Sequence, residues 1–129
     1  MSETECRKVD TLKEYELFFD SVSLKLFTYA YFALGDKESA QKLVGLSFVK
    51  GYKEASKASL SEKKIIEILT KELIKSSDSG KLLFKCASYL YFKERFSIEE
   101  IAFLLSCERE AAKEMIISFG EKLGAQVKA

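Results

Sequence analysis

Residues able to perform acid–base, nucleophilic or metal chemistry are scarce in this sequence. The 129-residue chain has no histidine, and its three cysteines, Cys6, Cys86 and Cys107, include no C-x-x-C pair. This pattern argues against a zinc site and is typical of reduced thiols in the cytosol. The adjacent carboxylates Glu99 and Glu100 are better explained by helix capping than by acid–base catalysis. We therefore expect neither an enzyme nor a bound metal or cofactor.

Binding of nucleic acid or protein is the chemistry that remains open to such a chain. The net charge is +1 and the pI about 7.6, so a nucleic-acid binder would need a local basic surface. Residues 50–85 hold nine lysines against five acids, for which a solvated helix face is the favoured interpretation. Over residues 106–123, Arg109, Lys113 and Lys122 stand against four glutamates, a net charge of −1.

Two short helices near the C-terminus must position these basic residues. Ser97 and Glu100 form a capping box, and apolar residues at helical spacing follow it to Leu105. Ser106 interrupts the pattern, and a second apolar series begins after it. With an upstream helix over residues 81–95, the pattern predicts a helix-turn-helix, which can present a recognition helix to the DNA major groove. Ordinary packing of a small helical bundle is the alternative.

Periodic apolar residues predict three more helices in the N-terminal half: 11–33, 37–55 and 59–75. Gly35 suits the end of the first helix, and Asp36 suits the N-cap of the second. Ser59 and Glu62 would form a capping box for the third. Apolar residues of the first helix extend beyond one face, so core packing or a dimer contact could cover them.

Domain boundaries follow from the one linker-like segment, residues 76–80. The expected architecture is all-α, with two small three-helix domains at residues 1–77 and 78–129. The N-terminus is charged and lacks the apolar core of a secretory signal, and no apolar run reaches the length of a membrane span. A cytoplasmic protein with no membrane contact is therefore expected.

Two motifs in this order resemble a known family. The C-terminal one reads Phe96-Ser-Ile-Glu-Glu-Ile-Ala-Phe-Leu-Leu-Ser-Cys107 and continues with Ala112-Lys-Glu-Met-Ile116 and Gly120-Glu-Lys-Leu123. The N-terminal one reads Ala33-Leu-Gly-Asp-Lys-Glu-Ser-Ala40 and precedes an amphipathic helix. Together they resemble bacterial RNA polymerase sigma factors of the extracytoplasmic-function type, in a shortened and degenerate form.

The resemblance implies a transcription initiation or regulatory protein without catalytic chemistry of its own. Its N-terminal domain would bind the RNA polymerase core, and its C-terminal domain would read promoter DNA. The resemblance places the polymerase contact on Gln41, Lys42, Gly45 and Leu46. It places the candidate DNA contacts on Arg109, Lys113 and Lys122.

The same positions depart from the family pattern and indicate a second hypothesis. An acidic and amide run of the family is replaced here by Gln41-Lys-Leu-Val-Gly-Leu46, and the recognition helix is acidic. Phe103 and Ile117 are apolar at positions expected to point outward, which suggests a protein interface. The alternative is thus a pseudo-sigma module that binds a partner protein or a second copy of itself and does not bind DNA.

Overall fold

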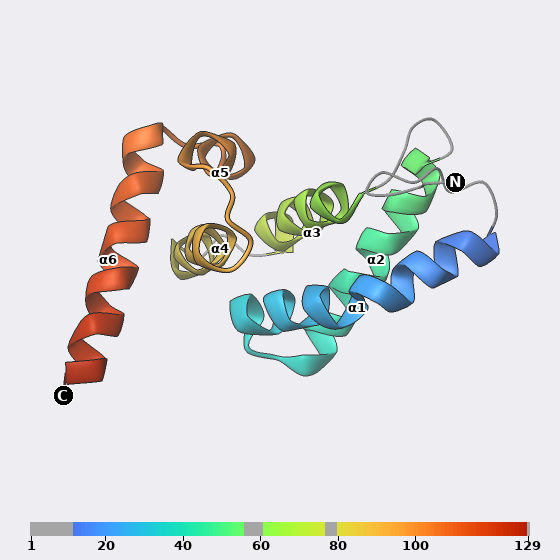
Figure 1. Ribbon diagram of the computed structural model, residues 1–129, viewed down its shortest axis with the longest axis horizontal. Coiled ribbons are helices and arrows are strands. Elements are labelled where there is room, and N and C mark those ends of the chain that lie inside the picture. Colours follow the sequence, from blue (N-terminus) through green and yellow to red (C-terminus); the bar gives the residue numbers. More distant parts are fainter. Residues whose placement is uncertain (1–11, 56–60, 77–79, 129) are drawn as a thin grey trace. The chain divides into compact units, whose positions relative to one another are not determined.

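The computed structural model describes residues 12–55, 61–76 and 80–128 of the chain. Within these ranges the ordered elements are α-helices and no strand occurs, which confirms the all-α class expected from the sequence. The helices labelled in Figure 1 are α1 (Leu12–Leu34), α2 (Lys37–Ala55), α3 (Glu62–Ser76), α4 (Gly80–Phe92), α5 (Ile98–Leu105) and α6 (Arg109–Lys128).

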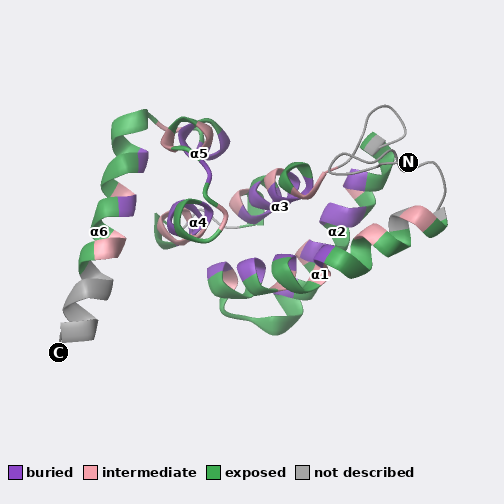
Figure 2. Cartoon of the chain, in the orientation of Figure 1, coloured by how far each residue is buried: buried purple, intermediate pink, exposed green. Residues whose placement is uncertain are grey.

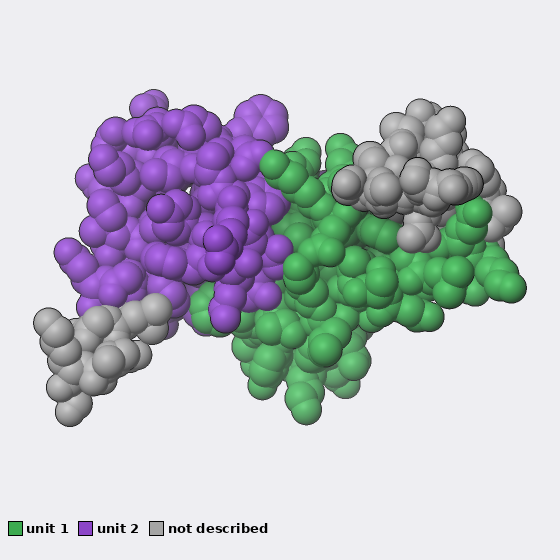
Figure 3. Space-filling model, in the orientation of Figure 1, with its two compact units in different colours: residues 1–73 green, residues 74–129 purple. Residues whose placement is uncertain are grey.

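The chain divides into two compact units, residues 1–73 and 74–129, which Figure 3 colours separately. Helices α1, α2 and most of α3 belong to unit 1, and α4, α5 and α6 belong to unit 2. The sequence places the boundary after residue 77, which lies outside the described residues. The structure places the division inside α3, where the side chain of Leu73 is still fully buried.

The turn between α1 and α2 follows the predicted capping pattern. Gly35 has a φ of 74°, a left-handed conformation that glycine adopts without strain, and its N–H donates to the carbonyl of Tyr31 at 2.7 Å. The carboxylate of Asp36 accepts the N–H of Ser39 at 2.8 Å, as an N-cap residue does. Both predictions are confirmed, and the turn makes α1 and α2 an antiparallel hairpin.

The core of unit 1 joins this hairpin to α3. The hydroxyls of Tyr29 and Thr70 are buried and lie 2.7 Å apart, and Lys50 pairs with the buried carboxylate of Glu72 at 2.5 Å. Figure 2 colours the buried residues purple, and the apolar ones in this unit are Val22, Leu26, Tyr29, Ala30, Ala33, Ala40, Val44, Phe48, Ile65, Ile66, Ile68, Leu69 and Leu73.

Helix α3 begins later than the sequence pattern suggested. Ser59, the predicted cap, lies outside the described residues, whereas Ser61 accepts the N–H of Lys64 with its hydroxyl at 3.2 Å. Ser61 therefore serves as the N-cap, and Glu62 is the first helical residue rather than the far end of a capping box. Glu62 instead forms an ion pair with Lys25 of α1.

The helical spacing of apolar residues over 11–33 and 37–55 predicts Phe19 and Tyr52 in the core, but both are exposed. Phe19 and Tyr52 retain 37% and 42% of their accessible surface. One side of the Phe19 ring packs edge-on against Phe48, with ring centroids 4.3 Å apart, and this leaves its other side open. The prediction was wrong because helical periodicity identifies one apolar face and does not show how much of that face a neighbour covers.

Unit 2 is built around the predicted capping box. The hydroxyl of Ser97 accepts the N–H of Glu100 at 3.1 Å, and the carboxylate of Glu100 accepts the N–H of Ser97 at 2.9 Å. Ser106 caps the C-terminal end of α5 in a left-handed conformation, with φ 56° and ψ 45°. The N–H of Cys107 donates to the carbonyl of Ala102 at 3.0 Å. This turn leads directly into α6.

Helix α4 is shorter than the predicted 81–95 because the chain turns after Phe92. Arg95 has a positive φ of 60°, and the N–H of the buried Phe96 donates to the carbonyl of Leu90 at 2.9 Å. The apolar side chains buried in this unit are Leu82, Cys86, Ala87, Leu90, Phe96, Ile101, Ala102, Leu104, Leu105, Ala112 and Ile116.

Candidate interaction surfaces

The outward side of α6 is the candidate DNA surface. Arg109 and Lys113 are exposed there, while the side chain of Lys122 lies outside the described part of the chain. Residues 108–121 carry two cations, Arg109 and Lys113, against four exposed glutamates, Glu108, Glu110, Glu114 and Glu121, a net charge of −2. Because DNA affinity depends largely on neutralising phosphates, this surface by itself would repel a duplex.

Arg109 is engaged by carboxylates of its own unit. Its Nε lies 2.7 Å from Oε2 of Glu99 on α5, and a second guanidinium nitrogen lies 3.7 Å from Oε2 of Glu110. The hydrogen bond from Arg109 lowers the pKa of the Glu99 carboxyl, and the same bond raises the pKa of Arg109. A DNA phosphate would therefore have to displace a carboxylate from this guanidinium.

The candidate protein-interface residues of unit 2 are both exposed. Phe103 on α5 retains 79% of its accessible surface, and Ile117 on α6 retains 49%. They lie on different helices, and the proposal that they form one patch remains a prediction.

Unit 2 carries an exposed aromatic cluster, whereas the apolar spacing of the helix predicted over residues 81–95 places Tyr91 in the core. Tyr91 and Phe92 are both exposed, and their ring centroids lie 5.1 Å apart. Phe92 also lies 6.2 Å from Phe119 of α6, measured between ring centroids. The signal available in the sequence was the pair of adjacent aromatic residues at the end of a helix, where one of them must face outward.

The four candidate polymerase contacts of unit 1 all lie on the surface of α2. Gln41, Lys42, Gly45 and Leu46 are each exposed. They occupy little more than one helical turn, so they form one continuous stretch of α2.

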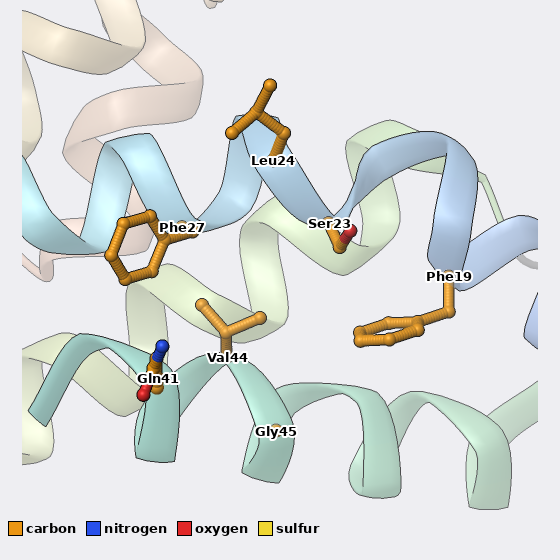
Figure 4. Close-up of a pocket in the computed structure, with 7 residues that line it drawn as sticks. All are labelled: Phe19, Ser23, Leu24, Phe27, Gln41, Val44 and Gly45. Atoms are coloured by element: carbon orange, nitrogen blue, oxygen red, sulfur yellow. The ribbon is translucent and has the colours of Figure 1, made fainter. Parts of the chain in front are cut away.

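An apolar groove runs along the α1–α2 hairpin beside this stretch (Figure 4). It encloses about 400 Å³. In Figure 4, Phe19 and Phe27 point from α1 toward α2, whereas Leu24 points away from α2. The lining residues are Phe19, Ser23, Leu24, Phe27, Gln41, Val44 and Gly45.

Gly45 lines the groove without a side chain. A Cβ atom built on this residue would meet no other atom within 4 Å, so packing inside the chain does not require glycine there. The resemblance identifies Gln41 and Gly45, and the apolar series of the first helix that extends beyond one face includes Phe27. Leu24 was not identified from the sequence.

Both helices of the hairpin carry large apolar side chains that are exposed. The large ones are Leu17, Phe19, Leu24, Tyr31 and Phe32 on α1, and Leu46, Val49 and Tyr52 on α2. Single exposed apolar residues are ordinary, so the ones that bear on a binding surface are those that line the groove, Phe19 and Leu24.

Helix α1 also has the length and composition of a possible membrane span, contrary to the sequence-based expectation. The segment Glu16–Leu34 meets both criteria, and 28% of the tested window is buried inside the protein. Core helices of soluble proteins meet the same criteria, so this finding does not assign a location.

The described residues contain no group of three or more histidine, cysteine, aspartate or glutamate side chains that could hold a metal ion. Cys86 is buried and Cys107 is partly buried, and burial raises the pKa of the Cys107 thiol. Cys6 lies outside the described residues.

Comparison with known proteins gives no further assignment of these surfaces. No protein-family model matches the chain, and no curated protein matches it with significant similarity.

Proposed function

We propose that this chain is a sigma-factor-like transcription protein that acts mainly through protein contact at α2 of unit 1. Promoter DNA contact by α6 is secondary in this proposal. Its basis is the resemblance of the two sequence motifs, together with one structural observation. The four positions that correspond to the polymerase contact, Gln41, Lys42, Gly45 and Leu46, are all exposed beside an apolar groove.

This surface has the composition of a protein-binding site rather than of a catalytic pocket. Its apolar centre would be desolvated by a partner helix, and Gln41 and Lys42 supply polar contacts at the edge. The expected partner, by resemblance, is the RNA polymerase core. Since the acidic run of the family is absent here, the apolar residues must supply a larger share of the affinity.

A pull-down and titration of the full chain with core RNA polymerase tests the proposal. The double variant Gln41→Ala/Leu46→Ser should weaken binding by roughly tenfold or more, because both side chains lie on the exposed stretch of α2. Glu114→Gln on α6 is the control, since it changes an exposed residue of the other unit. Failure of the wild-type chain to bind the polymerase would reject the proposal.

The second candidate is a protein-interaction module that does not bind DNA at all. It is favoured by the contact between Arg109 and Glu99, and by the net negative charge of residues 108–121. Titration with duplex DNA at several salt concentrations separates the two candidates. Binding that weakens steeply with added salt supports the first, and absence of binding at low salt supports the second.

A further inference from the structure

The exposed side of α1 carries a stripe suited to helix pairing. Leu17, Leu24 and Tyr31 recur every seven residues, and Leu24 retains 76% of its accessible surface, the largest fraction among the exposed apolar residues of the hairpin. Residues seven apart lie on the same side of a helix. Between them, the hydroxyls of Ser21 and Thr28 donate to carbonyls of their own helix, at 2.7 Å and 2.8 Å. The hydroxyls of Ser21 and Thr28 therefore do not require water.

Leu24 and Gly45 lie at a similar level along the axes of α1 and α2. The side chain of Leu24 forms a projection, and the missing side chain of Gly45 leaves a recess. Both line the groove, but Leu24 points away from α2 and does not fill it (Figure 4). Gly45 has open space where a side chain would begin. Glycine is a poorer helix former than alanine, and close approach of a second helix is a physical reason to have one at this position.

The two helices of the hairpin carry opposite net charges. In α1, Lys13 and Lys25 stand against Glu14, Glu16 and Asp20, a net charge of −1. In α2, Lys37, Lys42, Lys50 and Lys53 stand against Glu38 and Glu54, a net charge of +2. Glu16 and Asp20 are exposed on α1, near the end where Phe19 packs against Phe48. Lys42 and Lys53 are exposed on α2. A surface with one acidic and one basic edge is complementary to a second copy of itself, because a twofold axis along the groove exchanges the edges.

We infer that the α1–α2 hairpin is the contact surface of a homodimer. Each α1 lies over α2 of the other copy in antiparallel orientation, and Leu24 of each copy fills the recess above Gly45 of the other. The acidic edge then faces lysines of the second copy, and four helices enclose a shared apolar core. This arrangement rests on the charges and shape of unit 1 and does not depend on the sigma-like assignment. Because it covers Gln41 and Gly45 in the groove, a dimer and a polymerase complex at this surface exclude one another.

The face is large enough for such a dimer. Helices of 23 and 19 residues are about 30 Å long and together about 20 Å wide. The projected area is thus roughly 600 Å² per copy, close to the ~800 Å² of accessible surface that each partner buries in a stable interface.

Charge-reversal variants of the full chain test the dimer most sharply. In sedimentation equilibrium, the wild type should be dimeric, whereas Glu16→Lys/Asp20→Lys and Lys42→Glu/Lys53→Glu should each be monomeric, because both edges then carry the same sign. An equimolar mixture of the two variants should form a heterodimer, since each basic edge meets an acidic one. A loss of folding cannot produce this recovery. A monomeric wild type, unaffected variants, or a mixture that stays monomeric would overturn the inference.

Shape variants give an independent measurement. Leu24→Ser removes the projection and Gly45→Leu fills the recess, so each should raise the dimer dissociation constant by roughly tenfold or more. Phe103→Ser is the matched control, because Phe103 is as exposed as Leu24 but lies in unit 2. If Phe103→Ser dissociates the dimer and Leu24→Ser does not, the contact lies in unit 2 and the inference fails.

A lipid membrane would also bury the apolar residues of α1. Vesicle flotation of the same samples distinguishes membrane binding from dimerisation. The wild type is mixed with phosphatidylcholine vesicles and separated by flotation. A dimer that stays with the soluble fraction supports the inference. A chain that is monomeric in buffer and floats with the vesicles overturns it.

Discussion

The guanidinium of Arg109 donates a hydrogen bond of 2.7 Å to the carboxylate of Glu99, across the turn between α5 and α6. The residue best suited by type to contact a phosphate is thereby held by an anion of its own unit. Arginine prefers planar anions that accept two hydrogen bonds, and a carboxylate and a phosphate compete for the same donors. DNA binding by this unit should therefore depend on Glu99 as much as on Arg109.

Replacing Glu99 by glutamine should strengthen binding to duplex DNA. The substitution removes the charge that holds Arg109, so the guanidinium becomes available to a phosphate. One added phosphate contact should steepen the plot of log affinity against log salt by about 0.9. Filter binding or anisotropy over several salt concentrations measures this slope.

Glu114→Gln is the matched control for this prediction. It makes the same change in net charge on α6, and no hydrogen bond or ion pair with Arg109 is observed for Glu114 in the described residues. An equal gain from Glu99→Gln and Glu114→Gln would show that only net charge matters and would contradict a specific role of the Glu99–Arg109 pair.

The hydroxyl pair between Tyr29 and Thr70 should stabilise unit 1. Thr70 already donates to the carbonyl of Ile66 at 2.9 Å, so the Tyr29 hydroxyl can donate to the Thr70 oxygen at 2.7 Å. Tyr29→Phe should lower the free energy of unfolding by about 1 kcal/mol. A double-mutant cycle with Thr70→Val, followed by urea denaturation, should give a coupling energy of at least ~0.5 kcal/mol. Strictly additive effects of the two substitutions would exclude an energetic contribution from this bond.

The structural features that the sequence predicted correctly were mainly local ones. The cap at Asp36, the left-handed Gly35 and the Ser97–Glu100 box were all predicted correctly, because each depends on residues within one helical turn. The helical class followed from apolar periodicity for the same reason.

Features that depend on neighbouring helices could not be predicted in this way. Glu99 and Arg109 are ten residues apart and meet only because the turn at Ser106 brings α5 and α6 together. The exposure of Phe19 and Tyr52 likewise depends on how far the neighbouring helices cover α1 and α2, and the apolar pattern of a single helix does not specify this. The groove was predicted in part, since Gln41 and Gly45 were identified through resemblance and Phe27 through the apolar series of α1, whereas Leu24 was not identified.

Acid should weaken the cap of α2. The hydrogen bonds from Ser39 lower the pKa of the Asp36 carboxyl in the folded protein. A carboxyl whose pKa is lowered by folding stabilises the fold above its unfolded pKa, near 3.9, and this stabilisation is lost as the pH falls through the folded pKa. Asp36→Asn retains a capping oxygen but does not titrate. Wild type should therefore lose stability relative to this variant as the pH falls below about 4, as measured by urea denaturation. A stability difference that is independent of pH would contradict the role assigned to the Asp36 carboxylate.

Gly45→Ala should separate the stability of the fold from the stability of the dimer. Alanine is a better helix former, and its methyl group meets no other atom of the chain, so the free energy of unfolding should rise by about 0.5–1 kcal/mol. This free energy is measured in the Leu24→Ser background, at a chain concentration below the raised dimer dissociation constant, so that dimerisation does not add to the measured stability. In the otherwise wild-type chain the same methyl group occupies part of the recess and should weaken self-association. Gly120→Ala is the control, because its Cβ would lie at an ordinary 3.8 Å from the Phe92 ring in unit 2. It should stabilise its helix without changing the dimer.

If Gly45→Ala leaves the association of the two copies unchanged or strengthens it, the recess above Gly45 does not receive a side chain of the second copy.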